Sequence, residues 1–175
     1  LGTSQNQFIN HSPTCQNCPT SQYGILYFSQ SQNIVLKNFE LIAFGNTNGP
    51  TGDTRALLTI KQSQIKQLKD LNFELPAGSV YAMDVGTSAD QIKNINVEIS
   101  DSQLQCFKGI ELSGSHFQTI SNVSVTGPSN QLCHGGAFES WWATIDTFEN
   151  SDFIWSGIMG IHFFAGAGTS HLKGI

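Results

Sequence analysis

Two acidic residues and a histidine stand at matching places in the sequence and could perform acid–base chemistry. Asp84 and Glu111 are 27 residues apart, and each directly follows a small residue and an apolar one; His162 has the same context. If a repeating fold brings these positions side by side, two neighbouring carboxylates can raise one pKa for general-acid work or serve as a glycosidase pair. They can also bind Ca²⁺. Because polar residues fill most outward positions of a repeating fold, an ordinary solvated surface is the alternative.

A group of aromatic residues near the C-terminal end could bind a ligand or a partner. Trp141 and Trp142 are consecutive, and Phe138 lies just before them. Consecutive residues of a strand face opposite sides, so one tryptophan is expected to be exposed. An exposed tryptophan suits stacking on sugar rings or burial in a protein interface. The alternative is that both pack beneath a loop.

The four cysteines form two pairs by position. Cys106 and Cys133 each stand three residues before a glycine, and their 27-residue spacing predicts equivalent places on neighbouring coils. Stacked strands lie about 4.8 Å apart, which allows either a disulfide or two free buried thiols. Cys15 and Cys18 form a lone CxxC, for which a local disulfide is expected, since zinc needs four ligands and no metal site is predicted. An even number of cysteines suits an oxidising compartment.

Two triplets match the acceptor pattern for N-glycosylation. They begin at Asn10 and Asn122, and each has a serine two residues later. Such triplets arise often by chance in a chain with 27 Asn and Gln and 19 Ser residues. They therefore support secretion only weakly.

Composition excludes two classes of partner. The 175 residues carry 8 Lys and Arg against 13 Asp and Glu, a net charge of -5, without a basic run. A phosphate-neutralising face for nucleic acid is therefore excluded. The apolar runs are too short to cross a bilayer, so no membrane span is expected in this segment.

An internal repeat predicts the elements that position these residues. A small residue followed by an apolar one recurs at spacings of 32, 26, 27, 27 and 24, as Gly24-Ile25, Ala56-Leu57, Ala82-Met83, Gly109-Ile110, Gly136-Ala137 and Gly160-Ile161. About ten residues later in each copy comes an apolar pair three residues apart, often extended by a further apolar residue two positions on. The two-residue spacing predicts strands, and the three-residue step predicts a bend that keeps its apolar side inward. A β-sandwich of many short strands is the alternative.

The repeats resemble those of right-handed parallel β-helix proteins, the pectin-lyase-like superfamily. The resemblance rests on segments such as Gly109-Ile110-Glu111-Leu112-Ser113 and Thr119-Ile120-Ser121-Asn122-Val123, and it covers residues 24 to 175. It implies an all-β solenoid of about five to six coils with the six marker apolar residues stacked inward. It implies no activity, because this scaffold carries lyases, hydrolases, adhesins and silent surface modules. The motifs of the superfamily's polygalacturonase-like enzymes are missing.

The expected organisation is an N-terminal segment, 1–23, containing the CxxC loop, followed by the β-helix, 24–175. The half-finished repeats at both ends favour a fragment of a longer solenoid. The expected partners are therefore the remainder of that chain or neighbouring subunits, and a carbohydrate ligand is also considered.

The functional expectation is a non-catalytic extracellular or cell-surface module with a structural, adhesive or assembly role. The alternative is a carbohydrate-active enzyme, a polysaccharide lyase or glycoside hydrolase, using Asp84, Glu111 and His162. No cofactor is expected, apart from Ca²⁺ as an option at the two carboxylates.

Overall fold

Every strand pair in the structure is parallel, which gives a β-solenoid and excludes the β-sandwich. The computed structural model describes residues 6–10, 26–43, 55–76, 80–101, 106, 108–130, 132–157 and 159–175. Within these ranges the chain is all-β, without a helix. The strands are β1 (Asn6–Asn10), β2 (Leu26–Ser29), β3 (Ile34–Ala43), β4 (Arg55–Pro76), β5 (Val80–Ser100), β6 (Ile110–Ser113), β7 (His116–Thr126), β8 (Gly136–Trp141), β9 (Thr144–Glu149), β10 (Asp152–Ile154), β11 (Met159–Phe164) and β12 (Gly168–Lys173).

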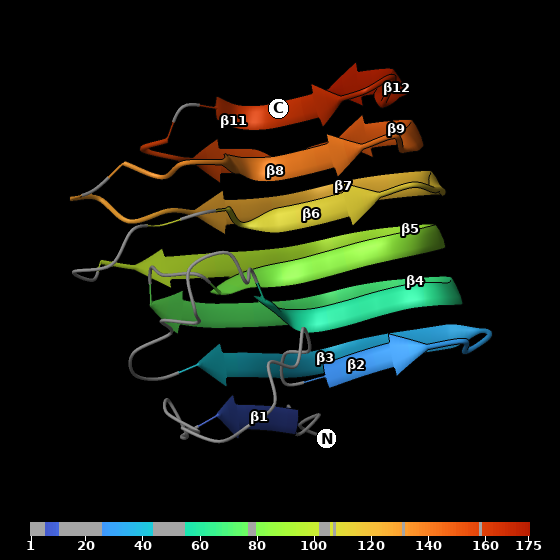
Figure 1. Ribbon diagram of the computed structural model, residues 1–175, viewed down its shortest axis with the longest axis horizontal. Helices are drawn as coiled ribbons and strands as arrows, with labels where there is room; N and C mark the ends of the chain where they lie inside the picture. The colour runs from blue at the N-terminus through green and yellow to red at the C-terminus, as the bar shows by residue number, and fades with distance from the viewer. Residues whose placement is uncertain are drawn as a thin grey trace.

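Each level of the solenoid has three sides. The strands rise from β1 at the bottom to β11 and β12 at the top (Figure 1). The first side consists of 26–29, 55–61, 80–86, 110–113, 136–141 and 159–164. The second side consists of 34–37, 64–69, 88–93, 116–121, 144–149 and 168–173. The third side consists of 6–10, 39–43, 71–76, 95–100, 123–126 and 152–154.

The solenoid makes about four turns. Four levels, 55–76, 80–100, 110–126 and 136–154, have a neighbour both above and below. The expected five to six coils also counted the terminal levels, so the difference is small.

The bend between the second and third sides is made by one residue in the left-handed conformation. At every level this residue has a φ between 51° and 63°: Asn38, Asp70, Asn94, Asn122, Asn150 and Gly174. Asn and Asp tolerate this conformation better than other non-glycine residues. The left-handed residue interrupts the alternation of the strand, so the apolar residues before and after it both face inward, as the three-residue step predicted.

The core is a set of apolar columns that run up the solenoid. Leu68, Ile92, Ile120 and Phe148 pair in register on the second side, and all are buried. Phe73, Val97 and Val125 form an equally buried column on the third side. Since one level cannot bury its inner face alone, stacking supplies the stability.

The predicted inward column on the first side is wrong by one residue at two levels. The observed column is Leu58, Met83, Ile110, Phe138 and Ile161. Leu58 and Phe138 therefore replace the predicted Leu57 and Ala137, while Ile25 lies outside the described residues. Side chains alternate along a strand, so a slip of one residue exchanges inward and outward positions. At both levels two adjacent residues, Leu57-Leu58 and Ala137-Phe138, could each serve as the apolar marker.

Candidate functional site

The outward residues of the first side form a column of acidic groups that ends in a histidine. Asp84 pairs in register with Glu111, as predicted. Glu111 pairs with Glu139, and Glu139 pairs with His162. These four residues, here called the acidic column, come from β5, β6, β8 and β11.

The marker Gly136-Ala137 would place Phe138 in this column, but Glu139 occupies that position. Phe138 is only 1% exposed and lies in the core, so it is not part of an exposed binding surface. Its ring packs near Phe148, with the ring centroids 4.8 Å apart. Glu139 could have been found from the sequence, because Ala137-Phe138 is also a small–apolar pair. Taking that pair as the marker places Glu139 after Glu111.

Two lysines pair with the three carboxylates of the acidic column. Lys61 Nζ lies 2.5 Å from Asp84 Oδ1. Lys108, in the connection before β6, donates a hydrogen bond to Glu111 and lies 3.2 Å from Glu139 Oε2. Burial alone would lower the pKa of Lys108, but the hydrogen bond that Lys108 donates to Glu111 and the charges of Glu111 and Glu139 outweigh it and raise the pKa. Lys108 is therefore charged at neutral pH.

Glu139 is held by further contacts. Although it carries a carboxylate, it is only 4% exposed. Its Oε1 accepts a hydrogen bond from the Gly136 backbone at 2.8 Å, and its Oε2 accepts one from Trp141 Nε1 at 3.3 Å. A buried carboxylate needs such partners, and Gly136, Trp141 and Lys108 orient it toward the structure rather than toward solvent.

His162 differs from the rest of the column. It stands beside Glu139, and its ring lies against Phe164. Its Nδ1 is buried and has no hydrogen-bond partner in the described part of the chain. Within the described ranges, His162 is therefore the one member of the acidic column with a buried polar atom that lacks a partner.

An aromatic cluster adjoins the acidic column on the same side. Trp141 stacks on Phe164, with ring centroids 3.7 Å apart and planes 3° apart. Trp142 lies at the bend between the first and second sides, with a φ of 51°, and is 64% exposed. Its ring centroid is 5.8 Å from that of Trp141. Trp141, Trp142 and Phe164 are here called the aromatic cluster. The hydrogen bond from Trp141 Nε1 to Glu139 Oε2 joins the aromatic cluster to the acidic column.

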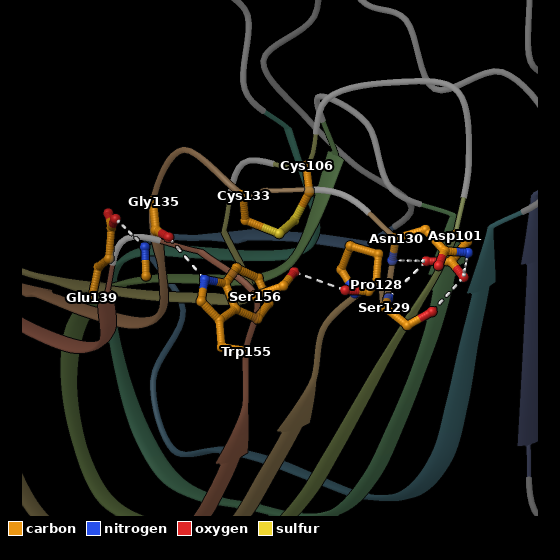
Figure 2. Close-up of a disulfide and its surroundings, with 11 residues drawn as sticks. Asp101, Cys106, Pro128, Ser129, Asn130, Cys133, Gly135, Glu139, Trp155 and Ser156 are labelled. Atoms are coloured by element: carbon orange, nitrogen blue, oxygen red, sulfur yellow. Dashed lines mark hydrogen bonds between the residues drawn. A yellow bond between two sulfur atoms is a disulfide. The ribbon is translucent and has the colours of Figure 1, made fainter.

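The expected pair of neighbouring cysteines is present and bonded. Cys106 and Cys133 form a disulfide with their Cα atoms 4.4 Å apart (Figure 2). It joins the connection between β5 and β6 to the connection between β7 and β8. A disulfide favours a non-cytoplasmic, oxidising compartment. Cys15 and Cys18 lie outside the described residues, so their expected pairing stays a prediction.

The connections around the disulfide are fastened by hydrogen bonds. Asp101 accepts bonds from the backbone and side chain of both Ser129 and Asn130, at 2.7 to 3.1 Å (Figure 2). The Ser129 hydroxyl is the largest cause of the lowered pKa of Asp101. Trp155 Nε1 donates to Gly135 O at 2.9 Å, and Ser156 donates to Pro128 O at 2.7 Å. Sequence reasoning did not identify these residues.

The two glycosylation triplets stay predictions. Asn10 is the last residue of β1. Asn122 is exposed at the left-handed bend, and its Nδ2 donates a hydrogen bond to Asn94 Oδ1 at 2.9 Å. Glycosylation would replace one hydrogen of this nitrogen.

Two kinds of feature are absent from the described residues. No group of three or more His, Cys, Asp or Glu side chains could hold a metal ion there. In the same ranges, no helix is long and apolar enough to cross a membrane.

Comparison with known proteins identifies no relative. No protein-family model matches the chain, and no curated protein or solved structure matches it significantly. Functional inference therefore depends on the geometry of the chain itself.

Proposed function

We propose that the protein is a non-catalytic binding module of the extracellular space or cell surface, with an adhesive or assembly role. The observation that carries this proposal is the aromatic cluster, in which Trp142 is 64% exposed beside the stacked pair of Trp141 and Phe164. Large aromatic side chains on a rigid sheet supply contact area at little cost in conformational entropy. The Cys106–Cys133 disulfide supports the oxidising location.

The state of the acidic column supports a non-catalytic role. Asp84 is paired with Lys61, and Lys108 lies between Glu111 and Glu139. A general acid must reach the reacting group and exchange protons with it. Carboxylates that are paired with lysines and fixed by hydrogen bonds are poorly placed for this exchange.

A carbohydrate-active enzyme on the same scaffold is the second candidate. It is favoured by the buried, unpartnered Nδ1 of His162 at the end of the column. The spacing of neighbouring strands, about 4.8 Å, is also close to the carboxyl separation of retaining glycosidases, about 5 to 5.5 Å. In this candidate Asp84, Glu111 and His162 would carry the acid–base work.

Replacing Trp142 tests the binding proposal. A panel of neutral and acidic polysaccharides is presented to the wild-type chain, and self-association is measured by sedimentation. Trp142→Ala is expected to weaken whichever association occurs by about 2 kcal/mol, or roughly thirtyfold, as for an aromatic anchor. Ile154→Ala is the matched control, because Ile154 is 61% exposed but lies on the third side. Equal losses in both variants would contradict the proposal.

The same panel separates the two candidates by turnover. The double variant Asp84→Asn, Glu111→Gln is expected to leave association nearly unchanged. If the wild-type chain degrades a polysaccharide and this variant does not, while its fold is retained, the enzyme candidate replaces the binding module.

A further inference from the structure

A polar groove runs along the outside of the bend between the second and third sides. It has a volume of about 430 Å³ and is lined by Asn38, Asp70, Asn72, Asn94, Ile95, Asn96, Asn122 and Ser124. These residues belong to four successive levels, so the groove extends about 14 Å along the solenoid at the usual strand spacing. Its volume is within the range of ligand sites. We call it the amide groove.

The local sequence explains why amides gather there. The left-handed residue of each level points outward, and the next residue points into the core. The residue after that points outward again, on the third side. Asn94, Ile95 and Asn96 show the pattern, since Ile95 is buried and the two asparagines are not. Two rows of polar side chains therefore face each other across the bend.

One row of amides is engaged and the other is open. Asn94 Nδ2 donates to Asp70 Oδ1 at 2.6 Å, and Asn122 Nδ2 donates to Asn94 Oδ1 at 2.9 Å. Asn72 and Asn96 pair in register on neighbouring strands. Among the described residues neither side chain has a hydrogen-bond partner, and neither is buried. Each open amide offers two donors and an acceptor to a ligand.

Charges of both signs flank the groove. Lys37, Lys69 and Lys93 stack in register on the second side, directly before the left-handed residues. Glu74 and Glu98 stack on the third side, two residues beyond Asn72 and Asn96. Burial, together with the charges of Glu40 and Glu98, raises the pKa of Glu74. A strongly charged polymer of either sign would thus meet repulsion along one margin of the groove.

We propose that the amide groove binds an extended, uncharged polysaccharide. Sugar hydroxyls both donate and accept hydrogen bonds, as do the open amides of Asn72 and Asn96. An elongated ligand suits a groove that crosses four levels. The one apolar lining residue, Ile95, is 1% exposed, so an apolar ligand gains little. A peptide that adds a strand needs a sheet edge, whereas the strands at the centre of the groove are paired on both sides.

This proposal is independent of the first-side proposal, because the two sites share no residue. Its test uses affinity electrophoresis of the whole chain in gels containing galactomannan, a soluble β-glucan or polygalacturonate. The double variant Asn72→Ala, Asn96→Ala is expected to weaken retardation by one or both neutral polymers about tenfold, by the loss of several hydrogen bonds. Gln64→Ala is the matched control, since Gln64 is an exposed amide of the same strand as Asn72 but lies on the second side. It is expected to leave retardation unchanged.

Four results would overturn the inference. The first is that neither neutral polymer retards the chain, and the second is that polygalacturonate alone retards it. The third is that the double variant and Gln64→Ala lose equal affinity. The fourth is that binding to the neutral polymers is lost in Trp142→Ala but retained in the double variant. The last result would place the glycan on the aromatic cluster, which supports the proposed function while refuting the groove. If the asparagine changes alter folding, Asn72→Asp, Asn96→Asp keeps the size of the side chains. This second double variant is expected to weaken binding to the neutral polymers, because it removes the N–H donors of the two amides.

Discussion

At the scale of single residues, the fold depends on the side chains that accept a left-handed backbone. Asn38, Asp70, Asn94, Asn122 and Asn150 each sit between two inward-facing residues of the bend. The sequence contains this signal as a polar residue followed by Asn or Asp between apolar positions. The three-residue step predicts the bend, but hydrophobic spacing alone does not show that the bend contains a left-handed residue.

Asn94 is expected to be important for stability through its backbone conformation. Asn94→Ala should destabilise the chain by about 1 to 2 kcal/mol, since alanine is disfavoured at a φ of 54°. The change also removes the bonds to Asp70 and Asn122. Asn94→Gly relieves the backbone penalty and should cost less than Asn94→Ala. Urea unfolding of both variants measures the difference, and equal stability of the two would show that backbone strain is unimportant there.

Asp101 is expected to link stability to pH. Its pKa is lowered in the folded state by hydrogen bonds, first of all from the Ser129 hydroxyl. A lowered carboxyl pKa contributes stability above its unfolded value, about pH 4, and this contribution is lost as the pH falls through the folded value. Asp101→Asn should therefore lower the Tm at pH 7, with the deficit shrinking toward pH 3. Asp152→Asn, an exposed charge change, is the control. A deficit that does not depend on pH would contradict this assignment.

At the scale of strands, the acidic column shows how register creates a charge network from distant residues. Asp84, Glu111 and Glu139 become neighbours only because their strands stack in register. Lys108 then lies between two carboxylates, with its own side chain 16% exposed. A partly buried ion network is costly to disrupt when one partner is removed, because the remaining charges lose their compensation.

Lys108→Met is expected to destabilise the chain by roughly 2 kcal/mol, a value reduced from that of a fully buried pair because some solvent reaches the network. Lys66→Met is the matched control, because both side chains of the Lys66–Asp90 ion pair are exposed. The control should change stability by less than about 0.5 kcal/mol. Chemical unfolding at low and high salt measures both. Similar losses in the two variants would show that the Lys108 network carries no special stability.

The predictions of strand position were correct where the repeat is regular and wrong where it is not. The neighbouring places of Asp84 and Glu111, and of Cys106 and Cys133, follow from a constant spacing of 27. Leu58 and Phe138 were missed because two adjacent residues could each serve as the marker. Ile145 and Phe148 have the same three-residue spacing as Ile120 and Val123, yet Ile145 pairs with Phe117 and Phe148 pairs with Ile120. Ser151 then takes the place expected for an apolar residue, and its hydroxyl oxygen accepts a hydrogen bond from the Val123 backbone N–H. Hydrophobic patterning alone could not show this substitution.

At the scale of the whole molecule, each level contacts only its neighbours above and below. The stability of a solenoid is therefore a sum of contributions from each level and from each interface between neighbouring levels. A link between two levels mainly stabilises those two levels. The Cys106–Cys133 disulfide is the one covalent link between levels in the described ranges. It lies in the same group of connections as the Asp101 and Trp155 hydrogen bonds (Figure 2). These connections leave the solenoid between its third and first sides, so they support the side that bears the acidic column and the aromatic cluster.

The disulfide is therefore expected to stabilise the middle levels more than the terminal ones. It closes a loop of 27 residues, for which chain entropy predicts a contribution of about 3.5 kcal/mol. The double variant Cys106→Ser, Cys133→Ser should lose most of this value, and hydrogen exchange should rise first in β6 and β8, which flank the bonded connections. β12 pairs with β9 and lies beyond the link, so its exchange should change little. A uniform rise along the chain would show instead that the solenoid unfolds as one cooperative unit, and the local model of its stability would then be wrong.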